Sequence, residues 1–407
     1  MHLTYVIYIL CLLLILCGGK CAGRGRFHED YLSNDVIKYV RGIAAVGVIV
    51  HHISLEELFK QTGELTVFQD AGYLFVALFF FSSGYGLLKN LDTNKDYLNG
   101  FLRRRLPVVL VPYYVSVLFY AIYIIAVNEH LEPLQWVTNI IGITMMNVDA
   151  WYPIVLAILY AAFYLIFKRD GSRIRKFVYI YLIILAMGIF FCLEGHFLWW
   201  AGSEPNWWMN PDNPETELWY MQDKVFWFTG EWWVNSQIAF LFGMIYETYE
   251  EKISGFFRKN YAVKNVLLFV VTAFWLYVTN IFLKDPGYWS EFAGNGPAIG
   301  AKFLLYFMQQ PATILFTLYI VVFMMKYRAI NPVARFFGKY SLETYMMNRL
   351  VILILTPILL ELPGRIIKDE RIAMPVYIIC VFAATILMAL VFRKVSDAVK
   401  KALGFVH

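Results

Sequence analysis

Long apolar stretches alternate with short polar ones along almost the whole chain. From residue 36 onwards the apolar stretches are Val36–Ser54, Val67–Leu88, Leu106–Val127, Trp151–Phe167, Phe177–Leu193, Trp233–Tyr246, Val266–Leu283, Pro297–Met325, Ser341–Leu360 and Met374–Phe392. Most have the roughly 17 to 25 residues that a helix needs to cross the hydrocarbon core of a bilayer. The pattern therefore predicts about ten core membrane spans.

The spans are predicted to be helices. Every backbone amide in hydrocarbon needs an internal partner, and the stretches lack the alternating apolar and polar positions of membrane strands. The predicted fold is thus all-α, a polytopic transmembrane helical bundle. The stretch Pro297–Met325 is longer than one vertical crossing requires and holds Pro311 near its middle, which favours a tilt or a kink.

A further apolar stretch at residues 1–17 precedes these spans. It has no basic residues before it, and Lys20, Arg24 and Arg26 follow it, where a cleaved signal would leave them outside the cell. We therefore favour an extra N-terminal hydrophobic helix, as an anchor or at the interface, over a signal-like segment. The expected organisation is an N-terminal segment with a basic linker at 1–30, a transmembrane domain at 31–395 and a short cytoplasmic tail at 396–407.

Basic side chains gather in every second loop between the spans. The loop after the second span holds Lys89, Lys95, Arg103, Arg104 and Arg105, whereas the loop after the first holds only Lys60. Short cytoplasmic loops collect Lys and Arg. The alternation thus predicts a multi-pass protein of the cell membrane, plasma or inner, with both ends of its core in the cytoplasm.

The composition excludes an ordinary soluble domain and gives no reason to expect nucleic acid as a partner. The 407 residues are 60% hydrophobic and only 16% charged, against about a quarter charged in soluble domains. The net charge of +5 is accounted for by the basic cytoplasmic loops. The five cysteines show no paired spacing and stand away from histidines, so no metal site is expected.

The first span carries ionisable side chains on one stripe. Arg41 and His52 are eleven positions apart, which in a helix is about three turns, about 16 Å and within roughly 20° of one line. His51 points about 80° away, and Glu56, one turn beyond His52, falls on the stripe if the helix continues. Snorkelling and a simple hydrogen bond between helices are the structural alternatives. Ionisable groups within a span are costly, however, and this favours a functional site.

The same stretch resembles a known family. Arg-Gly-Ile-Ala-Ala-Val-Gly-Val-Ile-Val-His-His, residues 41–52, is similar to the first core helix of the acyltransferase-3 family of membrane acyltransferases, in which a histidine follows an arginine by eleven positions. Residues 72–85, ending in Ser-Gly-Tyr, and residues 101–107, with three arginines, resemble later segments of that family; residues 151–152 and 337–345 are weaker echoes. Asn348 stands where relatives often carry a histidine.

The resemblance implies transfer of an acyl group, usually acetyl, from acetyl-CoA in the cytoplasm to a hydroxyl of an envelope or extracellular carbohydrate or glycolipid. His52 is then the expected general base, and Glu56 the group that orients it. Guanidinium groups suit the phosphates of the donor, although Arg103 to Arg105 also fit a purely topological role. The candidate site residues are catalytic His52 and Glu56, cofactor-binding Arg41, Arg104 and Arg105, and substrate-binding Ser83, Trp151 and Tyr152.

Two further interpretations stay open on sequence grounds. Ser82 and Ser83 fit close helix packing better than a nucleophile, because no base stands at a defined spacing. The longest outer loop, Glu194–Trp232, is rich in acidic and tryptophan residues, which suits either a sugar acceptor or an interfacial belt. The competing hypothesis from another class is a transporter or flippase whose buried charges line a solute path, although no paired halves are evident.

Overall fold

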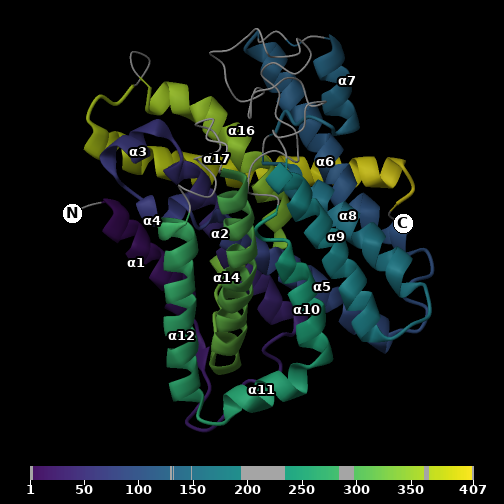
Figure 1. Cartoon of the computed structure of the whole chain (residues 1–407). Helices are drawn as coiled ribbons and strands as arrows, with labels where there is room; N and C mark the ends of the chain where they lie inside the picture. Colours follow the sequence, from purple (N-terminus) through teal and green to yellow (C-terminus); the bar gives the residue numbers. More distant parts are fainter. Residues whose placement is uncertain are drawn as a thin grey trace. The chain divides into compact units, whose positions relative to one another are not determined.

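Helices dominate the computed structural model, which describes residues 3–128, 131, 133–147, 149–193, 234–283, 298–361 and 366–405 (Figure 1). Within these ranges the β-sheet consists of two short antiparallel strands, β1 (Lys20–Cys21) and β2 (Tyr327–Arg328), with Lys20 opposite Arg328. The all-α fold is therefore confirmed. The tryptophan-rich outer loop lies outside the described residues.

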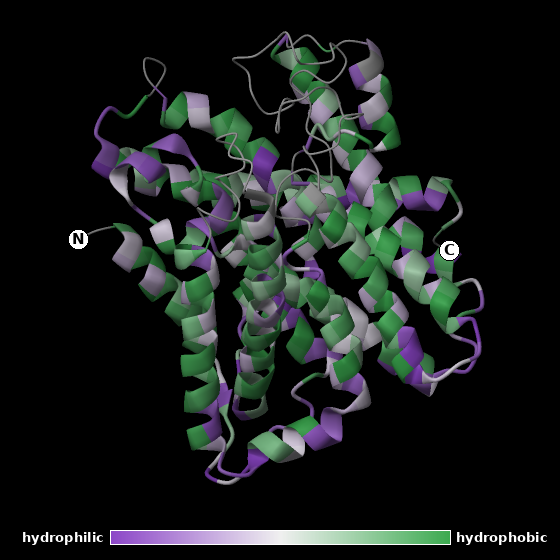
Figure 2. Ribbon diagram, in the orientation of Figure 1, coloured by the Kyte–Doolittle hydropathy of each residue, from purple (hydrophilic) through white to green (hydrophobic). Residues whose placement is uncertain are grey.

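Seven helices of the described ranges are long and apolar enough to cross a membrane. They are α2 (Asn34–Ser54), α5 (Gly72–Thr93), α6 (Phe101–Ala126), α12 (Tyr261–Tyr277) with the π-helical turn η2 (Val278–Phe282), α14 (Ala298–Lys326), α16 (Ser341–Leu359) and α17 (Glu370–Ala402). Figure 2 shows hydrophobic residues along these helices and hydrophilic residues in many of the turns. The chain is a polytopic helical membrane protein, as the apolar pattern predicts.

The other helices are shorter or begin in polar sequence. Two of them, α8 (Trp151–Phe167) and α9 (Arg173–Leu193), coincide with the fourth and fifth predicted spans, and α10 (Ile238–Thr248) with the sixth. The N-terminal α1 (Leu3–Leu16) has 14 residues and so a length of about 21 Å, less than the roughly 30 Å of a hydrocarbon core. The remaining short helices are α3 (Glu57–Thr62), α4 (Thr66–Gln69), α7 (Pro133–Ile141), α11 (Glu250–Arg258) and α15 (Pro332–Lys339).

The chain forms two compact units. The first contains residues 1–79, 111–116 and 320–407, and the second contains residues 80–110 and 117–319. Three helices, α5, α6 and α14, run from one unit into the other. Of the candidate site residues, the first unit holds Arg41, His52 and Glu56, and the second holds Ser83, Arg104, Arg105, Trp151 and Tyr152.

In the first unit, α2 packs on α15 and α16, and α16 packs along α17. Glycines allow the backbones of α2 and α15 to touch. A Cβ added to Gly42 would collide with the carbonyl of Ala334, and one added to Gly338 would collide with the carbonyl of Lys38. Such small residues are the usual means by which membrane helices approach closely. The first unit therefore holds α2 at a fixed distance from the C-terminal helices.

In the second unit, α5 and α10 pack in the same way. A Cβ on Gly84 would meet the backbone of Phe240, and one on Gly243 would meet the backbone of Phe81. Aromatic rings fill the space beside this contact: the ring centroids of Phe81 and Tyr246 are 5.9 Å apart, nearly edge to face. The Ser-Ser-Gly stretch that the sequence singled out thus lies on a close helix contact.

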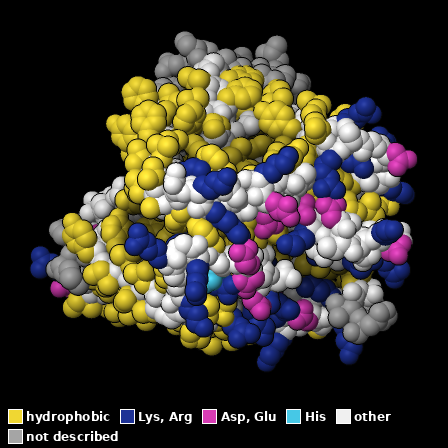
Figure 3. Space-filling view, turned by 90° about the horizontal axis from the view of Figure 1, so that it is seen from below, with side chains coloured by type: hydrophobic (Ala, Val, Ile, Leu, Met, Phe, Trp, Pro, Cys, Tyr) yellow, Lys and Arg dark blue, Asp and Glu magenta, His cyan; other side chains and the backbone are white. Residues whose placement is uncertain are grey.

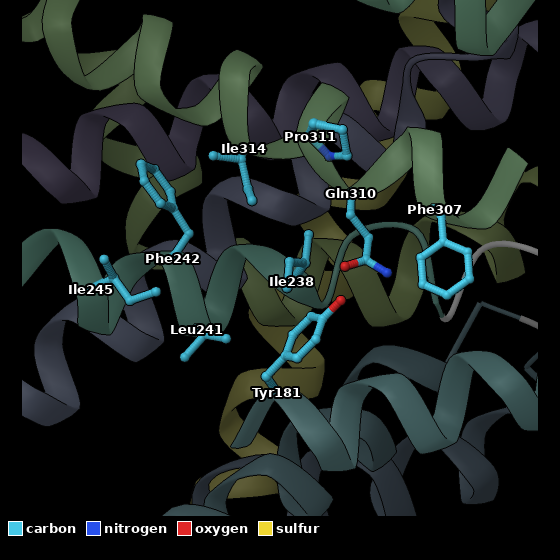
Figure 4. A pocket seen from close by; sticks show the side chains of 9 residues that line it. All are labelled: Tyr181, Ile238, Leu241, Phe242, Ile245, Phe307, Gln310, Pro311 and Ile314. Carbon is cyan, nitrogen blue, oxygen red and sulfur yellow. The ribbon is translucent and has the colours of Figure 1, made fainter. Parts of the chain in front are cut away.

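A cavity of about 420 Å³ lies within the second unit, among α9, α10 and α14. As Figure 4 shows, its labelled lining is aliphatic and aromatic apart from the amide of Gln310 and the hydroxyl of Tyr181. Pro311, beside Gln310, lies inside α14, which continues as one helix from Ala298 to Lys326. None of the candidate site residues lines this cavity.

Candidate functional site

Arg41 and His52 both face α16. The Nη2 atom of Arg41 donates a hydrogen bond of 2.9 Å to the hydroxyl of Ser341, and Nδ1 of His52 lies 3.1 Å from Oδ1 of Asn348. Ser341 and Asn348 are seven positions apart on α16, two turns of helix, and so they present one side to α2. The single stripe expected from the eleven-residue spacing is present in the structure.

The imidazole of His52 is held in the protein interior. His52 lies on the side of α2 that packs against α16, and the centroid of its ring is 6.5 Å from that of Tyr345. His52 is only 7% exposed. The low exposure shows that the ring is surrounded by protein side chains, within a helix long and apolar enough to cross a membrane. A buried imidazole with a defined polar partner is a suitable general base.

His51 is held differently from its neighbour. Its Nδ1 lies 2.8 Å from the carbonyl oxygen of Phe68, just before α5. The backbone at Gly72 lies so close that an added Cβ would collide with the His51 ring. The two imidazole centroids are 5.2 Å apart, yet Nδ1 of His51 lies against Phe68 of α4 and Nδ1 of His52 against Asn348 of α16. This separation makes His51 a natural comparison for His52.

Glu56 does not continue the stripe of α2. The helix ends at Ser54, and Glu56 has the extended backbone of the capping residue that precedes α3. Its carboxylate forms an ion pair of 3.0 Å with Arg349 and accepts a 2.7 Å hydrogen bond from the hydroxyl of Thr356. That hydroxyl also lies 2.8 Å from the hydroxyl of Tyr377. Glu56 thus anchors the segment after His52 to α16, and its catalytic role stays a prediction.

The opposite end of α16 carries a second ion pair. Glu343 is 5% exposed, and its Oε1 lies 2.8 Å from Nη1 of Arg393 on α17. The same guanidinium donates to Asp397 at 2.7 Å. Arg41 is close to the start of α16 as well, since it donates to Ser341, and its guanidinium lies 5.8 Å from the centroid of the Phe79 ring.

Arg104 and Arg105 form hydrogen bonds to the turn that precedes α6. Arg104 donates to the carbonyl oxygens of Asn99 and Tyr97, at 2.5 and 2.6 Å. Arg105 donates to the hydroxyl of Tyr97 at 2.7 Å and lies 5.7 Å from the centroid of that ring. Gly100, with a φ of 65°, makes the turn possible. These contacts give both arginines a structural role; their role toward a donor stays a prediction.

Trp151 and Tyr152 begin α8 as buried aromatic residues, 5% and 9% exposed. Both pack on Phe80 of α5, with ring centroids 6.4 and 5.0 Å apart. Ser83 lies one turn further along α5, beside the close contact made by Gly84. Trp151 and Tyr152 are therefore packed within the second unit and Ser83 is partly exposed; that the three residues touch an acceptor stays a prediction.

The residues of α16 that reach α2 are hard to recognise in the sequence. Arg349 was recognisable as an ionisable residue within a predicted span, but its partner Glu56 lies 293 positions away. Ser341 and Asn348 carried no signal of their own beyond the departure from the family pattern at Asn348. Among the described residues, no group of three or more His, Cys, Asp or Glu side chains is placed to hold a metal ion.

The fold and this site define a class: a polytopic helical membrane protein with a histidine buried inside its first core span, in line with an arginine. The family model described as an acyltransferase domain, that of acyltransferase-3, matches residues 34–394. The chain belongs to the acyltransferase-3 family and is a membrane acyltransferase. No curated protein and no solved structure matches it.

Proposed function

We propose that the protein is an O-acyltransferase that moves an acetyl group from cytoplasmic acetyl-CoA to a hydroxyl of an envelope or extracellular carbohydrate or glycolipid. The observation that carries the proposal is the buried imidazole of His52, 3.1 Å from Asn348 on α16. It lies about 16 Å along α2 from the guanidinium-bearing Arg41. Family membership supplies the acyl transfer; the acetyl group, the coenzyme and the hydroxyl acceptor are the proposal.

His52 acts as the general base in this scheme. It takes the proton from the acceptor hydroxyl as that oxygen attacks the carbonyl carbon of the thioester. The bond between carbon and sulfur then breaks, the coenzyme leaves as a thiolate and the imidazolium returns the proton to the sulfur. A well-placed base contributes roughly 10² to 10⁴ in rate.

Arg41 receives the phosphate groups of the donor. Guanidinium groups bind phosphate oxygens through paired, charge-assisted hydrogen bonds, and Arg41 is held by Ser341 on the side of α2 that also bears His52. The separation of about 16 Å between the two backbones leaves room for the extended arm of the coenzyme. The thioester then reaches the imidazole while the phosphates stay at the cytoplasmic end.

Charge supports the proposed orientation in the cell membrane. Figure 3, a view from below, shows many Lys and Arg side chains on that face of the protein, with Asp and Glu among them. Basic residues at the ends of membrane helices favour the cytoplasm. We therefore propose that the basic loops after the even-numbered spans, and both ends of the core, are cytoplasmic.

Acetyl transfer in membranes tests the proposal. Membranes containing the protein are incubated with acetyl-CoA labelled in the acetyl group, and label in glycans and glycolipids is measured for native protein, His52→Ala and His51→Ala. We expect His52→Ala to lose at least about 10²-fold in rate and His51→Ala to keep most of it. Undiminished transfer by His52→Ala would exclude His52 as the general base. An absence of acetyl transfer to any glycan or glycolipid by native protein would overturn the proposed donor and acceptor.

A further inference from the structure

We infer that Asn348 is the positioning residue that fixes the proton of His52 on Nδ1. The inference rests on the proposed function, because it concerns the residue proposed as the base. Asn348 is fully buried, at 0% exposed, and its Oδ1 lies 3.1 Å from Nδ1 of His52, 296 positions away in the chain. The contact joins α2 to α16 at the imidazole itself.

The chemistry of the amide determines the tautomer. An amide oxygen accepts hydrogen bonds and cannot donate them. Nδ1 of His52 must therefore carry the hydrogen, and a neutral imidazole then has its lone pair on Nε2. In this arrangement Nε2 is the basic nitrogen that takes the acceptor's proton, and the ring cannot rotate without breaking the bond to Asn348.

Packing alone does not explain an asparagine at this position. Among the described residues, the Nδ2 atom of Asn348 is buried and lacks a hydrogen-bond partner, a state that lowers the stability of the folded protein. A leucine of similar size would avoid this cost. The asparagine thus lowers stability where an apolar side chain would not, which is expected of a residue that holds a reactive group.

The surroundings of the pair keep the amide in place. Asn348 lies on α16 between Tyr345, whose ring is 6.5 Å from that of His52, and Arg349, which is paired with Glu56. Among the described residues, the ionisable groups near the imidazole include His51 on α2 and Tyr345 on α16, and the Glu56–Arg349 ion pair joins the segments that follow His52 and Asn348. The partner that directly contacts Nδ1 is neutral, so a carboxylate placed there would add a new negative charge.

Substitutions at position 348 test the inference through kinetics. We expect Asn348→Leu to lower kcat about 10²-fold and to leave KM for acetyl-CoA within about twofold, because the ring loses its orientation but the donor contacts remain. Asn348→Asp keeps an acceptor for Nδ1 and is expected to keep kcat within about tenfold. Its new charge stabilises the imidazolium, so the acidic limb of its pH–rate profile should move to higher pH.

Thr344→Val is the matched control. Thr344 is buried one turn earlier on α16, and its hydroxyl donates to the carbonyls of Tyr340 and Ser341 within the same segment. This variant should keep native kcat. Equal kcat for Asn348→Leu and native protein would overturn the inference, and so would equal losses in Asn348→Leu and Thr344→Val.

A spectroscopic readout separates this inference from the proposed function. In protein labelled with ¹⁵N-histidine, the His52 signals are identified by their absence in His52→Ala. Chemical shifts of a protonated Nδ1 and an unprotonated Nε2 at neutral pH, lost in Asn348→Leu, are expected even if no acyl transfer is found. A protonated Nε2 in native protein would overturn the inference while leaving His52 as a base.

Discussion

Arg349 on α16 forms an ion pair of 3.0 Å with Glu56, which directly follows the end of α2. Arg349 directly follows Asn348 in the sequence, and Glu56 stands four positions after His52. The ion pair therefore connects the end of α2, which carries His52, to α16, which carries Asn348. The side chains of Arg349 and Glu56 are 28% and 12% exposed, so the pair is largely shielded from water.

Removing Glu56 is expected to destabilise the protein. Glu56→Ala leaves Arg349 and the Thr356 hydroxyl without their partner, and breaking a shielded pair in this way should cost about 2 kcal/mol. Thermal unfolding in detergent measures the loss as a lower melting temperature. Glu57→Ala is the control, because Glu57 is the exposed neighbour. Equal melting temperatures for the two variants would show that the Glu56–Arg349 ion pair does not stabilise the protein.

Two glycine substitutions, one at the contact between α2 and α15 and one at an open position of α5, are expected to change stability in opposite directions. Gly42→Ala places a methyl group against the Ala334 carbonyl and should destabilise by about 1–3 kcal/mol. Gly86→Ala, in the interior of α5, meets no atom within 4 Å and should stabilise by about 0.5–1 kcal/mol through helix propensity. Thermal unfolding shows whether the melting temperature of each variant is higher or lower than that of native protein. A stabilised Gly42→Ala would show that the helices are not in contact there.

Glu247, at the end of α10 beyond the sixth predicted span, makes stability depend on pH. Burial raises its pKa to about 7, with the charge of Asp92 adding to the rise and that of Arg173 opposing it. The folded state therefore holds the proton more tightly than the unfolded state, whose pKa is 4.5. The resulting stabilisation is complete below about pH 4.5 and is lost as the pH rises through about 7.

Glu247→Gln, which stays neutral at every pH, is expected to melt at a higher temperature than native protein at pH 8. The difference should shrink as the pH is lowered toward 4.5. Melting curves across this range provide the measurement. Glu251→Gln is the control, because Glu251 is exposed on α11; an equal gain in both variants would point to net charge rather than to burial of Glu247.

Arg41 is expected to govern donor affinity. Arg41→Gln should raise KM for acetyl-CoA about tenfold and change kcat little, because one charge-assisted contact to phosphate is lost. Lys38→Gln, one turn earlier on α2 and half exposed, is the control and should keep native KM. A fall in kcat at unchanged KM in Arg41→Gln would instead place the guanidinium at the reacting group.

Much of the architecture followed from hydropathy. The apolar stretches at Val36–Ser54, Trp151–Phe167 and Ser341–Leu360 end within two residues of α2, α8 and α16, because hydrocarbon requires apolar helices of nearly fixed length. The N-terminal boundaries of α2 and α17 were less predictable, since their polar first turns extend beyond the hydrophobic run. The prediction that Glu56 continues the stripe of α2 was wrong, because the helix ends at Ser54 and Glu56 precedes α3.

The sequence by itself determined which side chains share one helix face. Arg41 and His52 lie on a single stripe because eleven residues are nearly a whole number of helical turns, and local geometry is enough to show it. What that stripe faces was decided by tertiary structure alone. Ser341, Asn348 and Arg349 come from about 300 residues further along the chain, and packing through glycines brings their helix there. Local periodicity carries no information about that partner.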